Sequence, residues 1–195
     1  MKQFAQLLLL QLLHAALLLI PTFAFLPAQT NDAFYVFVGV ILIAAISESL
    51  MTRSLQDGVA IRDLTALNVA KMVGVILLLG FWAAQIEALT TSLITQPVQF
   101  AAVISCLLGI GLRLSAIRTL GSRFRTDIVV ESVVRIGIYK YLKHPSEIGL
   151  LLFSIAAPLI IGSYRTSIAM ALLLTPISVW RIHRENLALN AKAIT

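Results

Sequence analysis

One apolar stretch runs from Ile148 to Trp180 with the sequence IGLLLFSIAAPLIIGSYRTSIAMALLLTPISVW. As a single α-helix, these 33 residues would extend about 50 Å, which is too long for one crossing of a bilayer core about 30 Å thick. The middle of the stretch, Gly162–Arg165, has the sequence GSYR, a turn-forming cluster with a charge. We therefore predict a membrane hairpin of two helices with its turn at these residues.

The composition of the whole chain is typical of a membrane protein. Of its 195 residues, 59% are hydrophobic and 12% are charged, which is about half the charged share of a soluble globular domain. We predict an all-α, polytopic membrane helix bundle of about six membrane segments, formed by residues 1–195 as a single domain. Besides the hairpin, four stretches are long and apolar enough to cross a bilayer: Phe4–Leu26, Ala33–Met51, Leu67–Leu89 and Pro97–Ile117.

The positions of the basic residues predict the orientation of the bundle, because Lys and Arg in short loops mark the cytoplasmic side. Six crossings with both termini in the cytoplasm place every basic cluster on that side and leave only Arg165 opposite. We expect an integral protein of the plasma (inner) membrane. A cleaved signal peptide over residues 1–28 is the alternative for the first segment, and it leaves the later orientation unchanged. The clusters are Arg53 and Arg62; Arg118, Arg123, Arg125, Arg135, Lys140 and Lys143; and Arg181, Arg184 and Lys192.

Charged residues within the spans have structural explanations at this stage. Glu48 and Glu87 lie near the ends of their helices, where we expect them at the membrane interface. Arg113 lies about one turn from the end of its span, so we expect its side chain to extend to the cytoplasmic face. These residues do not form a transport-like chain of charges, which argues against a small transporter.

Several other classes of site are excluded. The single cysteine, Cys106, excludes an internal disulfide, and three widely separated histidines make a structural zinc site unlikely on spacing. Gly109 and Gly111 begin a partial dinucleotide-binding pattern, but no strand precedes them. We interpret these two glycines as helix-packing residues.

The segment from Arg118 to Glu147 is the only sizeable cytoplasmic one, and the order of its residues is informative. It resembles the isoprenylcysteine carboxyl methyltransferase family and the related phospholipid methyltransferases. Their signature is a Leu-Gly with an aromatic residue three positions on, a Gly-x-Tyr-x-x-x-Arg-His-Pro-x-Tyr run, a membrane hairpin and a closing Arg-x-x-x-Glu-Glu. The resemblance covers about residues 113–190, whereas residues 1–112 match only as membrane helices of generic type. The matching strings are LGSRF at 120–124, GIYKYLKHPSEIG at 137–149 and RIHREN at 181–186.

The resemblance implies methyl transfer from S-adenosylmethionine to an O or N atom of a small or lipid-like acceptor at the cytoplasmic face of the membrane. It implies that residues 113–190 form the donor-binding part. Our candidate catalytic residues are Arg181 and Arg184, with the hypothesis that one or the other orients an anionic acceptor such as a carboxylate. The expected partners are the lipid bilayer and the acceptor, with no metal and no nucleic acid. The implied cofactor-binding residues are Gly137, Tyr139, Lys143, His144, Pro145, Glu147, Glu185 and Asn186.

The chemistry of these residues suits a sulfonium donor that carries a carboxylate, an amine and ribose hydroxyls. Lys143 and His144 can bind the carboxylate through charge-assisted hydrogen bonds, and Glu185 can accept from the hydroxyls or the amine. Tyr139, one helical turn before Lys143, can share its face. Pro145 disfavours helical geometry at His144 and so fixes where the imidazole points. Because the hairpin returns the chain to the same side, we expect Glu185 to meet His144.

Each residue also has an alternative role. Tyr139 can be an interfacial aromatic, Lys143 can bind an anionic lipid headgroup, and Glu185 can pair with Arg181 at a spacing of four. The chain also departs from the family pattern, with Glu147 in place of the aromatic residue and Asn186 in place of the second acidic one. These differences favour an alternative function, a non-catalytic membrane binding or assembly protein that keeps the methyltransferase-like fold.

Overall fold

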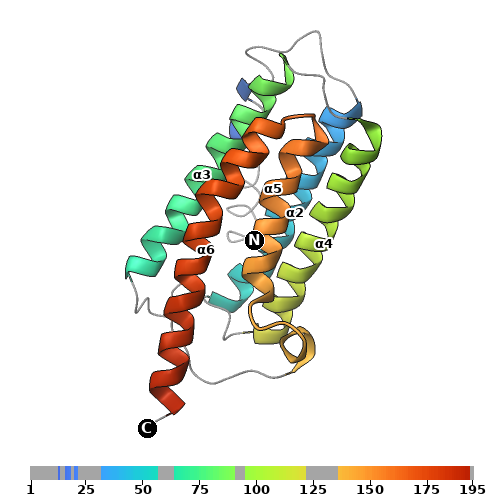
Figure 1. Cartoon of the computed structure of the whole chain (residues 1–195). Coiled ribbons are helices and arrows are strands. Elements are labelled where there is room, and N and C mark those ends of the chain that lie inside the picture. The colour runs from blue at the N-terminus through green and yellow to red at the C-terminus, as the bar shows by residue number, and fades with distance from the viewer. Residues whose placement is uncertain are drawn as a thin grey trace.

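The computed structural model describes residues 13, 16–18, 20–21, 32–56, 64–90, 95–121 and 136–193. Every regular element in this part of the chain is a helix (Figure 1). The first expected segment, Phe4–Leu26, lies mostly outside the described residues, but the described positions within it are helical. The elements are α2 (Asp32–Gln56), α3 (Leu64–Ala88), α4 (Gln96–Leu120), the short 3-10 helix η2 (Gly137–Lys140), α5 (Pro145–Ile160) and α6 (Tyr164–Ala193).

The all-helical class is confirmed, and three of the described helices, α2, α3 and α4, are long and apolar enough to cross a membrane. Each contains most of its predicted span and extends a few residues further at one end or both. Helix α5 is apolar but has only 16 residues. The total of six crossings therefore stays a prediction.

The predicted hairpin is present in the structure, since α5 ends at Ile160, α6 begins at Tyr164, and a tight turn joins them. Gly162 has a φ of 86°, a left-handed conformation that favours glycine. Helix α6 extends past Trp180, where the apolar stretch ends, because its 30 residues run from Tyr164 to Ala193.

Glu87, at the end of α3, binds the start of α6. Its carboxylate accepts hydrogen bonds from the backbone amides of Arg165 and Thr166 at 2.9 and 2.8 Å, and from the Thr166 hydroxyl at 2.7 Å. The first amides of a helix have no partner within the helix and attract negative charge. Glu87 is therefore more than an interfacial residue, because it caps α6 from a neighbouring helix.

Helices α4 and α5 cross at two glycines. A Cβ atom added at Gly149 would lie 2.5 Å from the carbonyl oxygen of Gly109, and one added at Gly109 would lie 2.7 Å from the carbonyl oxygen of Gly149. Small residues at a crossing allow two membrane helices to bring their backbones into contact. The helix-packing interpretation is confirmed for Gly109, whereas a Cβ atom at Gly111 would meet nothing within 4 Å.

Aromatic side chains join α2, α3 and α5 in the middle of the bundle. The ring of Phe81 packs edge-to-face against those of Phe37 and Phe153, with centroids 5.9 Å apart in each pair. On the other side of α3, the Trp82 indole donates a 2.8 Å hydrogen bond to the carbonyl oxygen of Leu17. That carbonyl has no helical partner four residues on, because Pro21 lacks an amide hydrogen.

Helices α2, α4 and α6 run in one direction and α3 and α5 in the other (Figure 1). The last residues of α2, α4 and α6 therefore meet the first residues of α3 and α5 at one end of the bundle, which we call the basic end. Arg165 lies at the opposite end, as the charge pattern predicts. The basic end faces the cytoplasm by prediction. Of the basic clusters expected on that side, the described side chains are those of Arg118, Lys140, Lys143, Arg181 and Arg184, whereas those of Arg53, Arg62, Arg123, Arg125, Arg135 and Lys192 lie outside the described part of the chain.

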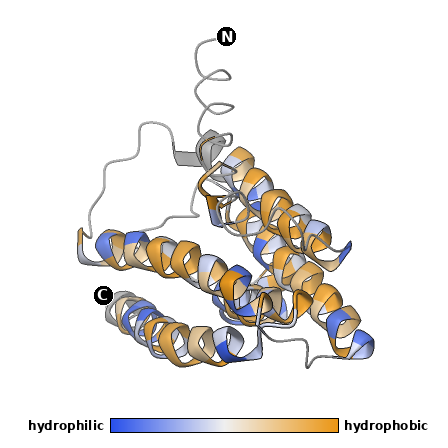
Figure 2. Cartoon of the chain, turned by 90° about the horizontal axis from the view of Figure 1, so that it is seen from above, coloured by the Kyte–Doolittle hydropathy of each residue, from blue (hydrophilic) through white to orange (hydrophobic). Residues whose placement is uncertain are grey.

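Hydrophobic residues occupy most positions along the helices (Figure 2). Large hydrophobic side chains such as Phe100 on α4 and Leu172 on α6 are exposed, at 69% and 70% of their surface. Such an apolar surface suits contact with lipid.

Candidate functional site

The expected site residues lie at the basic end, where the chain enters α5. Pro145 is the first residue of α5 and is buried, a position that suits proline because the first helical amide needs no partner. His144 precedes it with φ −132° and ψ 59°, outside helical geometry, as expected before proline. The imidazole is therefore held at the entrance to the hairpin.

The predicted contact between His144 and Glu185 is present. The imidazole Nδ1 lies 3.0 Å from Oε2 of the Glu185 carboxylate. The side chain of His144 is 9% exposed and that of Glu185 is 40% exposed, so the pair lies at the edge of the protein interior. Because a carboxylate only accepts, Nδ1 carries the proton in this contact. The opposite ring nitrogen, Nε2, is then an acceptor in neutral imidazole and a donor in imidazolium.

A second ion pair joins α5 and α6 beside this contact. Glu147 is buried, and its carboxylate accepts from Nε of Arg181 at 3.2 Å and from the Ser178 hydroxyl at 3.1 Å. Ser178, Arg181 and Glu185 follow one another at spacings of three and four, so they share one stripe of α6 that faces α5. Among the described residues, Glu185 and Arg181 do not form the i, i+4 ion pair, since each contacts α5 instead.

Two buried polar atoms at this site have no hydrogen-bond partner among the described residues. They are Nε2 of His144 and Oδ1 of Asn186. An unpaired polar atom in the interior costs free energy, and a polar ligand can satisfy such an atom. Nε2 belongs to the imidazole that contacts Glu185, and Asn186 is the next residue after Glu185 on α6.

The segment before His144 forms η2 rather than a continuous helix, and this corrects one expectation. Tyr139 and Lys143 do not share a helical face, because η2 ends at Lys140; Tyr139 is half-buried and Lys143 is exposed. Gly137 has a φ of 55°, and a Cβ atom there would lie 2.8 Å from the Thr119 hydroxyl on α4. Glycine therefore lets the segment pack against α4.

Burial and neighbouring charges shift the pKa of the Tyr139 phenol. Burial raises the pKa of its phenol above the ordinary value of about 10, the Glu185 and Glu147 carboxylates raise it further, and Arg113 opposes them. The hydroxyl therefore stays protonated and can donate a hydrogen bond throughout the physiological range.

The remaining expected residue, Arg184, is exposed on α6. Its guanidinium lies over the Trp180 ring, 5.7 Å from the centroid, as in a cation–π contact. It lies off the stripe of α6 that faces α5. Of the two arginines, Arg181 is therefore the one that contacts the start of α5, through Glu147.

Arg113, Glu48 and Ser146 form a third polar cluster, which the sequence did not predict. Arg113 does not extend to the surface as expected: its Nε and Nη2 donate to the two Glu48 oxygens at 2.7 and 2.5 Å. Its Nη1 donates to the Ser146 hydroxyl at 2.9 Å. One feature of the sequence could have indicated the Glu48–Arg113 pair: the two residues carry opposite charges and lie at similar distances from the cytoplasmic ends of their predicted spans.

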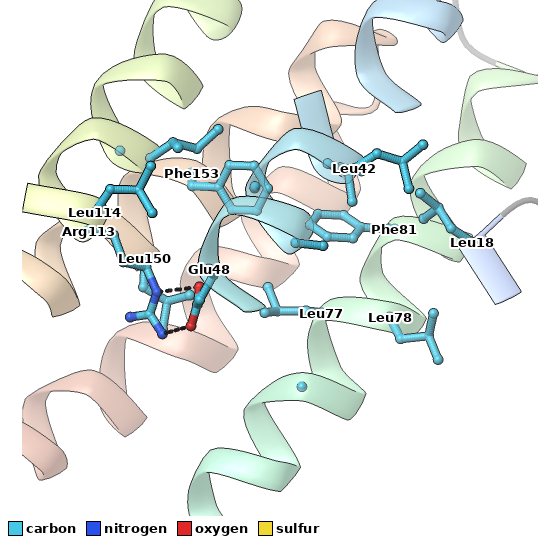
Figure 3. A pocket seen from close by; sticks show the side chains of 17 residues that line it. Leu18, Leu42, Glu48, Leu77, Leu78, Phe81, Arg113, Leu114, Leu150 and Phe153 are labelled. Carbon is cyan, nitrogen blue, oxygen red and sulfur yellow. Dashed lines mark hydrogen bonds and ion pairs between the residues drawn. The ribbon is translucent and has the colours of Figure 1, made fainter. Parts of the chain in front are cut away.

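A cavity of about 250 Å³ lies above this cluster, between α2, α3, α4 and α5 (Figure 3). Its walls are mostly apolar, with Phe81 and Phe153 among them, and Glu48 and Arg113 are the charged residues that line it. The volume lies between that of a cavity that holds benzene, about 150 Å³, and that of drug-sized pockets, about 300–1,000 Å³. It therefore suits a small apolar group.

Comparison with known proteins links this part of the chain to a family. Residues 100–191 match the family model described as the isoprenylcysteine carboxyl methyltransferase family. The match includes η2, the hairpin, His144 and Glu185, and the family implies a membrane-bound methyltransferase, an enzyme. No curated protein and no solved structure matches the chain significantly. Among the described residues, no group of three metal-ligating side chains could hold a metal ion.

Proposed function

We propose that this chain, whose residues 100–191 match the model of the isoprenylcysteine carboxyl methyltransferase family, methylates an O or N atom of a small or lipid-like acceptor, with S-adenosylmethionine as the donor. The observation that carries the proposal is the His144–Glu185 contact, whose second imidazole nitrogen, Nε2, is buried and has no partner among the described residues. We place the reaction at the cytoplasmic face, because the charge pattern assigns the basic end to that side.

The residues at the site fit the polar groups of the donor. Glu185 and Oδ1 of Asn186 can accept from the donor's amine and ribose hydroxyls. In its protonated form, His144 can donate from Nε2 to the donor's carboxylate, with Lys143 adding positive charge nearby. The Tyr139 hydroxyl adds a further donor.

Catalysis then depends on position and on the exclusion of water. When bound, S-adenosylmethionine would supply a methyl group on a sulfonium: the acceptor's lone pair would form the new bond to carbon, and the electron pair of the broken carbon–sulfur bond would stay on sulfur. An anionic acceptor has no proton to lose, whereas a neutral one would release its proton to solvent. Arg181, held by Glu147, orients an anionic acceptor, and Arg184 attracts it from the exposed side of α6.

The cavity supports a lipid-like or small apolar acceptor. Its apolar walls can hold the hydrophobic part of such a molecule, and Arg113 at its polar end lies close to Ser146, two residues after His144. An acceptor dissolved in the bilayer would then approach the site from the side, while the donor arrives from the cytoplasm.

Calorimetry of the purified protein in detergent tests the donor site directly. We expect heat of binding with both S-adenosylmethionine and S-adenosylhomocysteine, and loss of that heat in His144→Ala and Glu185→Ala. His183→Ala is the matched control, because His183 is exposed on the same helix as Glu185. No binding by folded wild-type protein would refute the proposal and favour the non-catalytic binding or assembly protein.

Charge reversal tests the acceptor site separately. We expect Arg181→Glu and Arg184→Glu to weaken an anionic acceptor in steady-state assays while the affinity for S-adenosylhomocysteine changes less. Unchanged acceptor affinity in both variants would remove the assigned role of these arginines.

A further inference from the structure

Arg113 connects three helices at the basic end of the bundle. From α4, its guanidinium binds the carboxylate of Glu48 on α2 through two nitrogens and the hydroxyl of Ser146 on α5 through the third. The same Nη1 also lies 3.5 Å from the backbone carbonyl oxygen of Ser146. Each of the three guanidinium nitrogens thus donates to a partner.

This arrangement leaves the guanidinium little freedom to move. A bidentate pair with a carboxylate fixes both the distance and the plane of the guanidinium. The side chain of Arg113 is only 20% exposed, and the Gly109–Gly149 contact lies one helical turn away on the same two helices. Arg113 is therefore a fixed point against which the first turn of α5 is placed.

The first turn of α5 is held alternately from two sides. His144 and Glu147 contact α6, through Glu185 and Arg181, whereas Ser146 between them contacts α4 through Arg113. His144 itself has no side-chain bond that caps α5. The direction of its imidazole therefore depends on where these opposing contacts hold the turn.

We infer that Arg113 is a positioning residue for the donor site: through Ser146 it sets the orientation of His144. The inference rests on the proposed function for its effect on donor binding, but its effect on the imidazole is independent of any ligand. The contact also gives the cavity and the donor site one shared group, because Arg113 lines the first and holds the second.

Ser146→Ala is the decisive variant, because it removes the hydroxyl that Arg113 binds and leaves the ion pair with Glu48 intact. Ser146→Thr restores a hydroxyl at the same position. Ser154→Ala is the matched control: it removes a buried hydroxyl from the same helix, but within the described part of the chain that hydroxyl bonds only to the Leu150 carbonyl of α5 itself, at 2.6 Å.

Two measurements are made on each variant in detergent. The first is the histidine ring NMR spectrum, with the His144 signal assigned by its loss in His144→Ala. The second is the affinity for S-adenosylhomocysteine by calorimetry. We expect Ser146→Ala to shift the His144 signal and to weaken binding about 3- to 10-fold, the range that the loss of one hydrogen bond gives. Ser146→Thr and Ser154→Ala should resemble the wild type in both.

The outcomes distinguish the positioning role of Arg113 from the proposed methyltransferase function. A His144 signal and an affinity that are the same in Ser146→Ala as in Ser154→Ala would overturn the role of Arg113. If the wild type does not bind S-adenosylhomocysteine, the proposed function fails, and the NMR spectrum alone still decides whether Arg113 positions the imidazole. A shift in Ser146→Ala that Ser146→Thr does not reverse would also count against the inference, since any disturbance of the turn would then suffice.

Discussion

Replacement of Gly149 by alanine should destabilise the protein through the α4–α5 crossing. The added Cβ atom would lie 2.5 Å from the Gly109 carbonyl oxygen and 3.0 Å from the Arg113 amide nitrogen. Ordinary contact begins at 3.4 Å, so the helices must separate locally by about 0.9 Å. Neither neighbour is the flexible end of a side chain, and both backbones belong to helices. The strain therefore has no inexpensive means of relief.

The expected cost follows from this geometry. Overpacking of this kind costs about 1–3 kcal/mol, whereas alanine gains up to about 1 kcal/mol over glycine from helix propensity. With the full gain in propensity the net loss is up to about 2 kcal/mol, which for a chain of this length lowers Tm by up to about 8 °C. Thermal unfolding in detergent, followed by tryptophan fluorescence, measures it.

Gly111→Ala is the control for this experiment, because it lies on α4 only two residues from the crossing and its Cβ atom meets nothing within 4 Å. It should keep the gain in helix propensity without the strain, so its Tm should equal or exceed that of the wild type. If Gly149→Ala unfolds at the same temperature as Gly111→Ala or above it, the close crossing does not stabilise the native bundle as argued.

Three further outcomes are expected. Glu147→Ala should destabilise the protein by about 3–5 kcal/mol in denaturant unfolding, because it leaves the largely buried Arg181 without its carboxylate. The double variant with Arg181→Met should recover much of that loss, and a double variant as unstable as the sum of the single ones would contradict this. Glu87→Ala should lower the free energy of unfolding by about 1–2 kcal/mol, because it removes the cap on α6. Thr166→Val removes one of the three hydrogen bonds and should cost less than half of that, so equal effects would argue against capping. Because the pKa of Tyr139 is raised in the folded state, the contribution of its phenol to stability is complete below pH 10 and declines as the pH rises above that value, where the unfolded chain ionises first. Tyr139→Phe should weaken this alkaline decline in stability. If the phenol is protected as described, the variant should also leave the absorbance titration of the native protein at 295 nm near pH 10 unchanged.

The parts of the fold that depend on local sequence could be predicted. Gly162 and its polar neighbours interrupt an apolar stretch too long for one crossing, so the turn position follows from composition and length alone. The meeting of His144 with Glu185 follows from that turn, because two helices of a hairpin must bring their far ends together. The role of both residues in donor binding stays a prediction.

Contacts between helices distant in sequence could not be predicted in the same way. Glu48 and Arg113 are 65 positions apart, and whether they meet depends on the rotation of α2 and α4 about their axes, which hydrophobicity all round a membrane helix does not fix. The same holds for Glu147, where the family resemblance suggests an aromatic position and the structure has an ion pair with Arg181. Tyr139 was misplaced relative to Lys143 for a local reason, since four residues of 3-10 helix replace the expected α-helical turn.

The short length of α5 has a consequence for depth. Sixteen residues rise about 24 Å, whereas the hydrocarbon layer is about 30 Å thick. If the α5–α6 turn is level with one boundary of that layer, Pro145 begins about 6 Å inside the other boundary, and the imidazole before it lies just beneath the lipid headgroups. A lipid-soluble molecule can reach such a level from within the bilayer, and a water-soluble one from the headgroup side.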